Sequence, residues 1–378
     1  MNEQTFDLKD RIVSIDALRG LAMFLILSTQ IGGAFIFTTF NNMLWNENWP
    51  GFVSGQLSWE TQSVSFINIS QSIFVFVVGL VIPFSITNRL LRTDKKRIYL
   101  HIIKRALILF LLGLIAGGKL LNLPEYNRTL SNIPVYNNVL EYISISYLVC
   151  AILVLNTTKL TQYILTGVFL LLVWGIFLFI PAPGWHGDIY SQEMNIGMYI
   201  ENMVLGQHSS HFGSWTGVLN TFGHISTMLF GVLISNIIFG SKNKTDKTKL
   251  LFICGLVMLP AGWIWGLFYP VMRNYMTGSF VLETCGIATL LLATFYLIID
   301  VRGYSKWAFF FIVFGVNSIA IYMMAHLFDF RLIGNIVIGG FSNLFAPNVK
   351  EFIQAVAAMA VMWLIMYWMY LKKTFIKI

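Results

Sequence analysis

An acidic and a basic residue, Asp16 and Arg19, lie near the start of the first long apolar stretch of this 378-residue chain. Charged groups at the mouth of a membrane span are costly there, so they are candidates for a function. Their i, i+3 spacing places them on one helix face, where they can neutralise each other. Two interpretations follow: an ion pair that anchors the helix, or a guanidinium that binds the phosphates of a ligand.

Polar residues continue along the same helix face. Gln30 lies eleven residues after Arg19, which returns it to that face about 16 Å further along the axis. In the second apolar stretch, Asn68 and Ser72 have i, i+4 spacing, and Gly79 on the same face permits a close helix contact. These two faces predict either a polar route through a helix bundle or hydrogen bonds between neighbouring helices.

Ionisable side chains also occur at the expected outer ends of later apolar stretches. They are Glu141, His224, Glu283 and His326. Gln30 and Asn68 are expected at a similar depth, and six polar groups at one level predict the lining of a pocket.

The inner side is expected to be cationic instead. Its basic residues are Arg19, His101, Lys104, Arg105, Arg302 and Lys306. Such a surface suits a phosphate-bearing ligand, although the inward bias of positive charge in membrane proteins predicts much of it as well.

The composition is that of an integral membrane protein. Hydrophobic residues make up 57% of the chain and charged residues 11%, against about 25% charge in soluble domains. The mean hydropathy is +0.71. The polar start leads directly into a full-length apolar stretch, so we expect no cleavable signal peptide. Cys150, Cys254 and Cys285 lie within apolar runs, which predicts core packing rather than a disulfide or a metal site.

Apolar runs of about twenty residues, each long enough to cross a ~30 Å hydrocarbon layer, predict an all-α bundle of about ten transmembrane helices in a single domain, residues 1–378. If the N-terminus is cytoplasmic, twenty Lys and Arg residues fall on the inner side and five on the outer side. This asymmetry places both termini in the cytoplasm and explains the net charge of +8 without nucleic acid. The expected spans are 16–38, 64–86, 99–121, 139–156, 162–181, 218–239, 250–269, 279–299, 307–328 and 352–371.

Three further segments are expected at the outer side. Residues 39–63 are rich in Trp, Asn and Gly, and residues 182–217 contain His208 and His211. Residues 332–348 are weakly apolar, and we expect them to lie in the membrane interface or to re-enter the membrane.

Four blocks of sequence resemble those of the transmembrane acyltransferases related to heparan-α-glucosaminide N-acetyltransferase, in the bacterial branch of that family. The blocks follow the same order over nearly the whole chain. They are 14–20; 74–79 with 82–85; 195–201 with 227–233; and 262–267 with 300–304, 307–309 and 314–318.

The resemblance implies an activity and a location. Acetyl-CoA would donate an acetyl group from the cytoplasmic side to an amino sugar or oligosaccharide on the other side, in a bacterial inner membrane. It also implies that a histidine in the loop before the second span is the base, assisted by an amide at the outer end of the first span. Acyl transfer needs such a base and such an oxyanion donor.

The chain departs from this pattern at the implied site. Gln30 replaces the amide-bearing Asn, and residues 39–63 contain no histidine; Gln56 or Ser58, just before Trp59, stands about where the histidine is expected. Asn68 and Ser72 replace an Asp and a Pro.

We therefore assign Gln30 as the hydrogen-bond donor to the oxyanion. We favour His224 as the base and keep Glu283 as the alternative base. Gln56, Trp59, Asn68, Glu141 and His326 are expected to bind the acceptor. Arg19, Arg105 and Arg302 are expected to bind acetyl-CoA, and we expect no metal.

Two other functions remain open. A sugar transporter or permease would use the polar route without acyl chemistry, and a paralogue that has lost catalysis would still bind ligands. His208 and His211 could also reach the site from their loop. Membrane lipid is an expected partner, and the sequence leaves open whether the chain forms a homo-oligomer.

Overall fold

The structure is a computed structural model that describes residues 12–29, 31–32, 34–46, 48–57, 63–118, 133–209 and 217–375. Within these ranges the chain is helical and forms no strand. Eight helices are long and apolar enough to cross a membrane. They are α4 (Phe66–Leu90), α5 (Lys95–Ala116), α6 (Val139–Asn156), α7 (Lys159–Phe179), α9 (Gly217–Ile238), α10 (Lys244–Gly266), α11 (Gly278–Phe295) with the π-helical turn η4 (Tyr296–Val301), and α15 (Pro347–Leu371).

A ninth span is broken in its middle. The 3-10 turn η5 (Lys306–Ala308) and α12 (Phe309–Val316) meet α13 (Ser318–Leu327) at an angle of 64°. Asn317 separates the two helices, with backbone angles outside the helical region. The predicted all-α membrane bundle is confirmed, with eight long spans, or nine with the broken one, among the described residues.

The first expected span, 16–38, is interrupted. Helix α1 (Val13–Thr29) has 17 residues, and a second helix, α2 (Ile36–Trp45), follows. Between them Gly32 and Phe35 have φ angles of 79° and 32°, which end the helix. The segment expected as a loop before the second span therefore contains most of α2 and the short helix α3 (Gly51–Leu57).

Glycines set the closest helix contacts. A Cβ atom at Gly20 would collide with the carbonyl of Phe311 on α12, and one at Gly315 would collide with the carbonyl of Asp16 on α1. The same reciprocal relation joins Gly79 on α4 to Gly231 on α9, each of which faces a backbone carbonyl of the other helix. Small residues allow membrane helices to approach closely, and these four lie in the blocks that carry the family resemblance.

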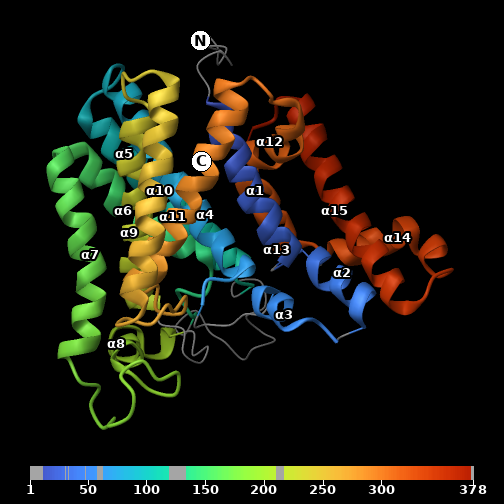
Figure 1. Ribbon diagram of the computed structural model, residues 1–378, viewed down its shortest axis with the longest axis horizontal. Coiled ribbons are helices and arrows are strands. Elements are labelled where there is room, and N and C mark those ends of the chain that lie inside the picture. The colour runs from blue at the N-terminus through green and yellow to red at the C-terminus, as the bar shows by residue number, and fades with distance from the viewer. Residues whose placement is uncertain are drawn as a thin grey trace.

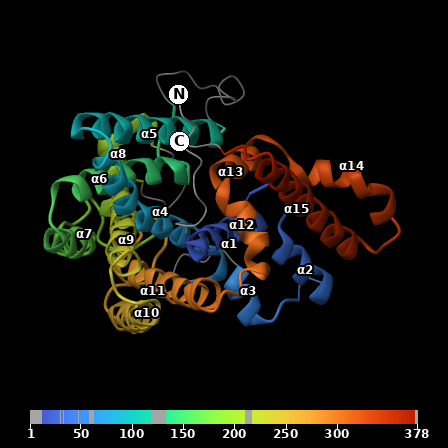
Figure 2. The same ribbon diagram turned by 90° about the horizontal axis from the view of Figure 1, so that it is seen from above.

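The helices form two groups. Helices α4 to α11, including the short α8 (Ile196–Leu205), lie on one side of the molecule (Figure 1). Helices α1, α2 and α12 to α15, including the short α14 (Phe330–Ser342), lie on the other. The view from above separates the same two groups (Figure 2). Helix α1 packs on both α12 and α4, so these contacts join the two groups near the middle of the protein.

The start of α1 is held by Asp300, which lies 287 residues after Val13 in the chain. The backbone N–H groups of Val13 and Ser14 donate hydrogen bonds to the Asp300 carboxylate, at 3.2 and 3.1 Å. The Lys244 ammonium donates to the carbonyl of Asp300 at 2.7 Å. Asp300 therefore satisfies backbone donors at the start of α1 that have no partner within the helix.

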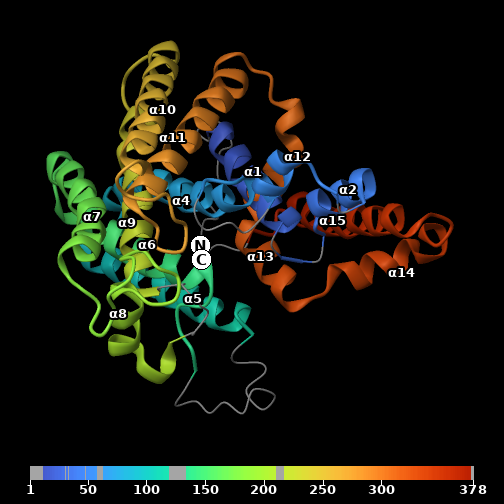
Figure 3. The ribbon, with the colours of Figure 1, turned by 60° about the horizontal axis from the view of Figure 1, so that its bottom comes forward.

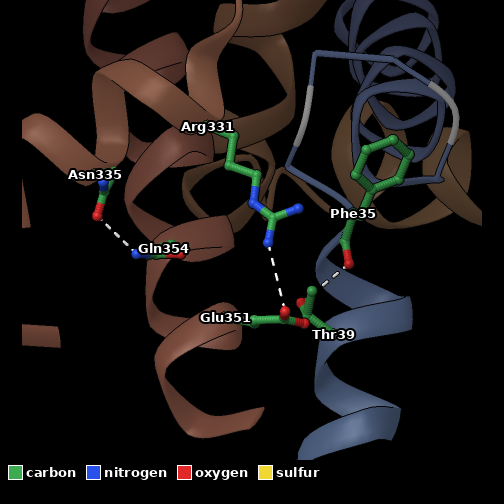
Figure 4. A network of polar contacts seen from close by, with 6 residues as sticks. All are labelled: Phe35, Thr39, Arg331, Asn335, Glu351 and Gln354. Carbon is green, nitrogen blue, oxygen red and sulfur yellow. Dashed lines mark hydrogen bonds and ion pairs between the residues drawn. The ribbon is translucent and has the colours of Figure 1, made fainter. Parts of the chain in front are cut away.

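The segment expected to lie in the interface or to re-enter, 332–348, forms most of a short apolar helix, α14 (Phe330–Ser342), which packs on α15. The two helices extend away from the rest of the bundle (Figure 3). Arg331 and Glu351 form an ion pair at 3.6 Å, and Gln354 donates to Asn335 at 2.7 Å (Figure 4). These two links hold α14 against α15.

Candidate active site

A carboxylate on α11 occupies a space created by two glycines of α10. A Cβ atom at Gly262 would lie 2.6 Å from Cγ of Glu283, and one at Gly266 would lie 3.8 Å from its Oε1. Gly262 and Gly266 are one helical turn apart, so they present one face to α11. A side chain at position 262 would displace Glu283, whereas a Cβ atom at position 266 would make ordinary van der Waals contact with it.

The Glu283 side chain lines a cavity of about 360 Å³, a volume within the usual range for small-molecule sites. The cavity lies between α10, α11 and the segment just before α4. Its lining residues are Ser63, Val64, Leu259, Trp263, Val271, Glu283 and Ile287. Glu283 is only 4% exposed, so its carboxyl group is largely withdrawn from bulk solvent.

Trp263 is a polar neighbour of this carboxyl group at the cavity. Its side chain is within hydrogen-bonding reach of Glu283, and the indole N–H is the only donor that it has. Ser63, which carries a hydroxyl group, also lines the cavity. A carboxylate, an indole N–H and a hydroxyl can together accept a proton and orient a polar head group.

His224 lies in a different environment, a buried chain of hydrogen bonds. Arg273 donates to Oε1 of Gln71 at 2.9 Å, and Nε2 of Gln71 lies 2.9 Å from Nε2 of His224. The Gln71 amide nitrogen can only donate, so Nε2 of His224 is the acceptor. Nδ1 of His224 must then carry the proton and donate to the carbonyl of Asn220, 2.8 Å away.

This network fixes a neutral imidazole with both nitrogens engaged. His224 is fully buried, and its ring is stacked on Tyr142, with ring centroids 4.9 Å apart and planes at 11°. Burial lowers the pKa of the Arg273 guanidinium to about 10, which leaves the group charged near neutral pH. Arg273 therefore places a positive charge at one end of the chain that ends at His224.

A second cluster joins the start of α6 to α13. Oδ1 of Asn138 accepts from the Tyr322 hydroxyl at 3.0 Å, and its Nδ2 lies 3.4 Å from Nε2 of His326. Glu141, in the first turn of α6, accepts from the backbone N–H of Tyr136. Glu141 and His326 therefore lie at this cluster. The sequence predicts that they share one pocket with Glu283, but among these residues it is Glu283 that lines the large cavity.

A much smaller cavity separates the two clusters. Its volume is about 10 Å³, enough for about one water molecule. Gln71 of the first cluster and Tyr322 of the second both line it. It is too small to hold a substrate, and we therefore take the cavity at Glu283 as the candidate site.

Gln56 and Asn68 hold the segment that leads into α4. Gln56 is exposed, and its Oε1 accepts from the backbone N–H of Phe66 at 3.1 Å. Asn68 is 1% exposed and directs its amide toward the carbonyl of Ser63 at 3.5 Å. Both residues therefore lie close to one wall of the cavity. Gln30, Trp59 and His211 lie outside the described residues.

The three basic residues expected to bind the acyl donor lie on three elements. Arg19 on α1 pairs with Asp16 at 3.6 Å. Arg105 on α5 places its guanidinium carbon 4.5 Å from the centroid of the Tyr147 ring, a cation–π geometry. Arg302 follows η4 and is exposed. His208, in the 3-10 turn η3 (Gly206–His208), bonds the carbonyl of Ile133 through Nδ1 at 2.9 Å.

Sequence reasoning missed the contribution of three residues to these sites, which are Trp263, Arg273 and Gln71. Trp263 was noted only as part of a motif, and Arg273 only as an outer charge. Gln71 precedes Ser72 and was not singled out. The sequence did contain a signal for Arg273. Only eleven residues connect the two apolar helices α10 and α11, so an arginine in this connection must lie close to both helices.

The described helices form a membrane bundle, and sequence comparison defines the class to which the chain belongs. The chain belongs to the family defined by the acyltransferase domain, whose model matches residues 12–371. It is similar to heparan-alpha-glucosaminide N-acetyltransferase from Homo sapiens, with 24% identity over 433 residues. That match covers 98% of this chain and 60% of the human protein, so the chain spans about 60% of the length of this relative. The family resemblance inferred from the four sequence blocks is confirmed.

Proposed function

We propose that the protein transfers an acetyl group from acetyl-CoA, used on the cytoplasmic side, to an amino sugar on the opposite side of a bacterial inner membrane. The observation that carries this proposal is the position of Glu283. It is a buried carboxylate that lines a cavity of substrate size at the ends of α10 and α11.

The cavity favours Glu283 over His224 as the base. Both ring nitrogens of His224 are engaged within a buried network, whereas the Glu283 carboxyl group faces the cavity. A base must come within hydrogen-bonding reach of the proton that it removes. In this proposal, the Arg273–Gln71–His224 chain holds α4, α9 and the α10–α11 loop in place around the site.

The reaction would proceed in three steps: proton removal, attack on the thioester and loss of CoA. Glu283 takes a proton from the ammonium group of the acceptor, and the free amine attacks the thioester carbonyl carbon. The tetrahedral oxyanion is stabilised by hydrogen-bond donors, for which we assign the Gln30 amide. The C–S bond then breaks, the second proton of the attacking nitrogen passes to the CoA sulfur, and CoA leaves as the thiol. Glu283 then releases the proton that it took. The products are the N-acetylated sugar, CoA and one released proton.

The acyl donor would approach from the inner ends of the helices. Arg19, Arg105 and Arg302 are the residues that we propose to bind its phosphates, because guanidinium groups pair with phosphate through two parallel hydrogen bonds. The acceptor would enter at the outer ends, where Gln56, Asn68 and Trp59 are the proposed contacts. Glu141 and His326 lie at the start of α6 and on α13 rather than at the cavity, so this proposal does not assign them to the acceptor.

Transfer by the purified protein tests this function. The protein is placed in lipid nanodiscs with radiolabelled acetyl-CoA and a panel of amino sugars, and acetylated product is counted. Product formation that depends on the protein supports the proposal. Binding of acetyl-CoA without product would instead support an inactive paralogue. Sugar flux into proteoliposomes without acetyl-CoA would support a transporter.

A further inference from the structure

The cavity at Glu283 reaches the lipid-facing surface of the bundle. Trp263 lines the cavity and is also 59% exposed. Helix α10, which carries Trp263, is the least buried of the eight long spans, with 17% of its apolar window covered by the protein. Its exposed neighbours are large and apolar, as expected of a surface that faces hydrocarbon. They include Val257, Ile264, Leu267 and Phe268.

The cavity is polar at one level and apolar at the next. Glu283 and Trp263 lie at the same level, because α10 and α11 run in opposite directions and Gly262 contacts Glu283. Leu259 and Ile287 each lie one turn deeper, about 6 Å further into the span. Leu259 is seven residues from the end of α10, which puts it about 10 Å below that end. The apolar part of the cavity is therefore within the hydrocarbon region.

The apolar wall continues beyond the cavity. Leu256 lies three residues before Leu259 on the same face of α10, and it is 60% exposed. A hydrocarbon chain that left the cavity along Leu259 would therefore pass over Leu256 into the bilayer. A free sugar has no group that would gain from this surface, whereas each buried methylene of a chain would stabilise binding.

We propose that the acceptor is an amphiphile, an amino sugar linked to a hydrocarbon tail, and that it enters sideways from the membrane. The sugar lies at Glu283, Trp263 and Ser63, and the tail lies along Leu259, Ile287 and Leu256. The identity of the head group rests on the proposed acetyl transfer. The position of the tail does not, because it follows from the cavity walls.

Photolabelling locates the tail without requiring catalysis. The probe is dodecyl glucosaminide with a diazirine at the end of the alkyl chain, added to the protein in nanodiscs. After irradiation, labelled residues are mapped by mass spectrometry. We expect labels on Leu256, Leu259 and Ile287 that excess dodecyl glucosaminide removes, and none on Val257. Labels spread evenly over the lipid-facing helices, α7 included, would overturn the proposal.

Two variants fill the apolar end of the cavity, and a third serves as the control. Leu259→Trp and Ile287→Trp should each reduce the competed labelling at least about tenfold, the factor that two buried methylenes supply. Val257→Trp lies on the opposite face of α10, about 3 Å along the helix from Leu259, where the side chain is 63% exposed, and should leave labelling unchanged. Labelling unaffected by either cavity variant would contradict the proposal. If neither variant folds, the wild-type label map decides.

A transfer assay separates this proposal from the enzyme function. With acetyl-CoA, dodecyl glucosaminide should have a KM at least about tenfold below that of methyl glucosaminide. Equal KM values, with no effect of Leu259→Trp, would remove the tail site and leave the transferase standing. Localised, competed labelling with no transfer to either acceptor would remove the transferase and leave the tail site standing.

Discussion

Gly262 on α10 and Glu283 on α11 are in direct contact, and the missing side chain of the glycine leaves the space that the carboxylate fills. A Cβ atom at position 262 would also lie 2.8 Å from the backbone nitrogen of Glu283. The glycine therefore sets both the spacing of the two helices and the position of the proposed base. This gives the glycine–tryptophan motif of residues 262–266 a physical role.

Gly262→Ala should displace Glu283 and weaken the α10–α11 contact. We expect a loss of about 1–3 kcal/mol of stability, typical of overpacking, together with reduced transfer. Thermal unfolding and acetyl transfer in nanodiscs measure the two effects. The control is Gly167→Ala on α7, where a Cβ atom would meet nothing within 4 Å. Equal melting temperatures for both variants would show that the close contact is absent.

Arg273→Ala should destabilise the protein by removing a buried donor. The acceptor oxygen of Gln71 would lose its hydrogen bond from Arg273, for which the usual cost is about 1–3 kcal/mol. Arg331→Ala is the comparison, because its ion pair with Glu351 is about half exposed and such pairs contribute about 1 kcal/mol or less. Melting temperatures rank the two variants, and an equal or larger loss at Arg331 would contradict the assigned network.

Arg19→Ala should weaken acetyl-CoA binding by about tenfold or more, the scale of hydrogen bonds to charged groups. The competing explanation is that Arg19 only neutralises Asp16, whose side chain is 8% exposed. In that case Arg19→Ala would destabilise the protein, and Asp16→Ala with Arg19→Ala would restore stability. Rescued stability combined with full acetyl-CoA affinity in the double variant would rule out the binding role.

Glu201, on the short helix α8 (Ile196–Leu205), should make stability depend on pH. Burial raises the pKa of its carboxyl group above the usual value of about 4.3. Between these two values the folded protein holds a proton that the unfolded chain has released, so stability falls as pH rises through that window. The plot of melting temperature against pH should become flatter in this window for Glu201→Gln. The control is Glu193→Gln, at an exposed position, for which the plot should keep its slope. Identical slopes would contradict the burial of Glu201.

Hydropathy predicted most of the bundle, because membrane spans must be long and apolar. It overestimated the first span, since the apolar residues at 31–38 hide a break at Gly32 and Phe35 that depends on backbone angles rather than on composition. It also passed over the break at Asn317, because the flanking residues are apolar on both sides.

The candidate site was only partly accessible from sequence. The sequence singles out Glu283 as an ionisable residue near the end of an apolar stretch, and the structure places it on a cavity wall; its role as a base stays a prediction. The engagement of His224 depends on Gln71 and Arg273, which are 153 and 202 residues away from their partners in the chain. Such pairings follow from the packing of α4, α9 and the α10–α11 loop, and no local pattern encodes them.

The central claim, that Glu283 is the base for acetyl transfer, is tested most directly by its amide variant. Glu283→Gln keeps the size of the side chain and removes its basicity, so transfer should fall by about 10²-fold or more while the melting temperature changes little. Glu351→Gln, on the distant α14–α15 pair and 45% exposed, is the control and should transfer at the wild-type rate. Wild-type transfer by Glu283→Gln would contradict the account.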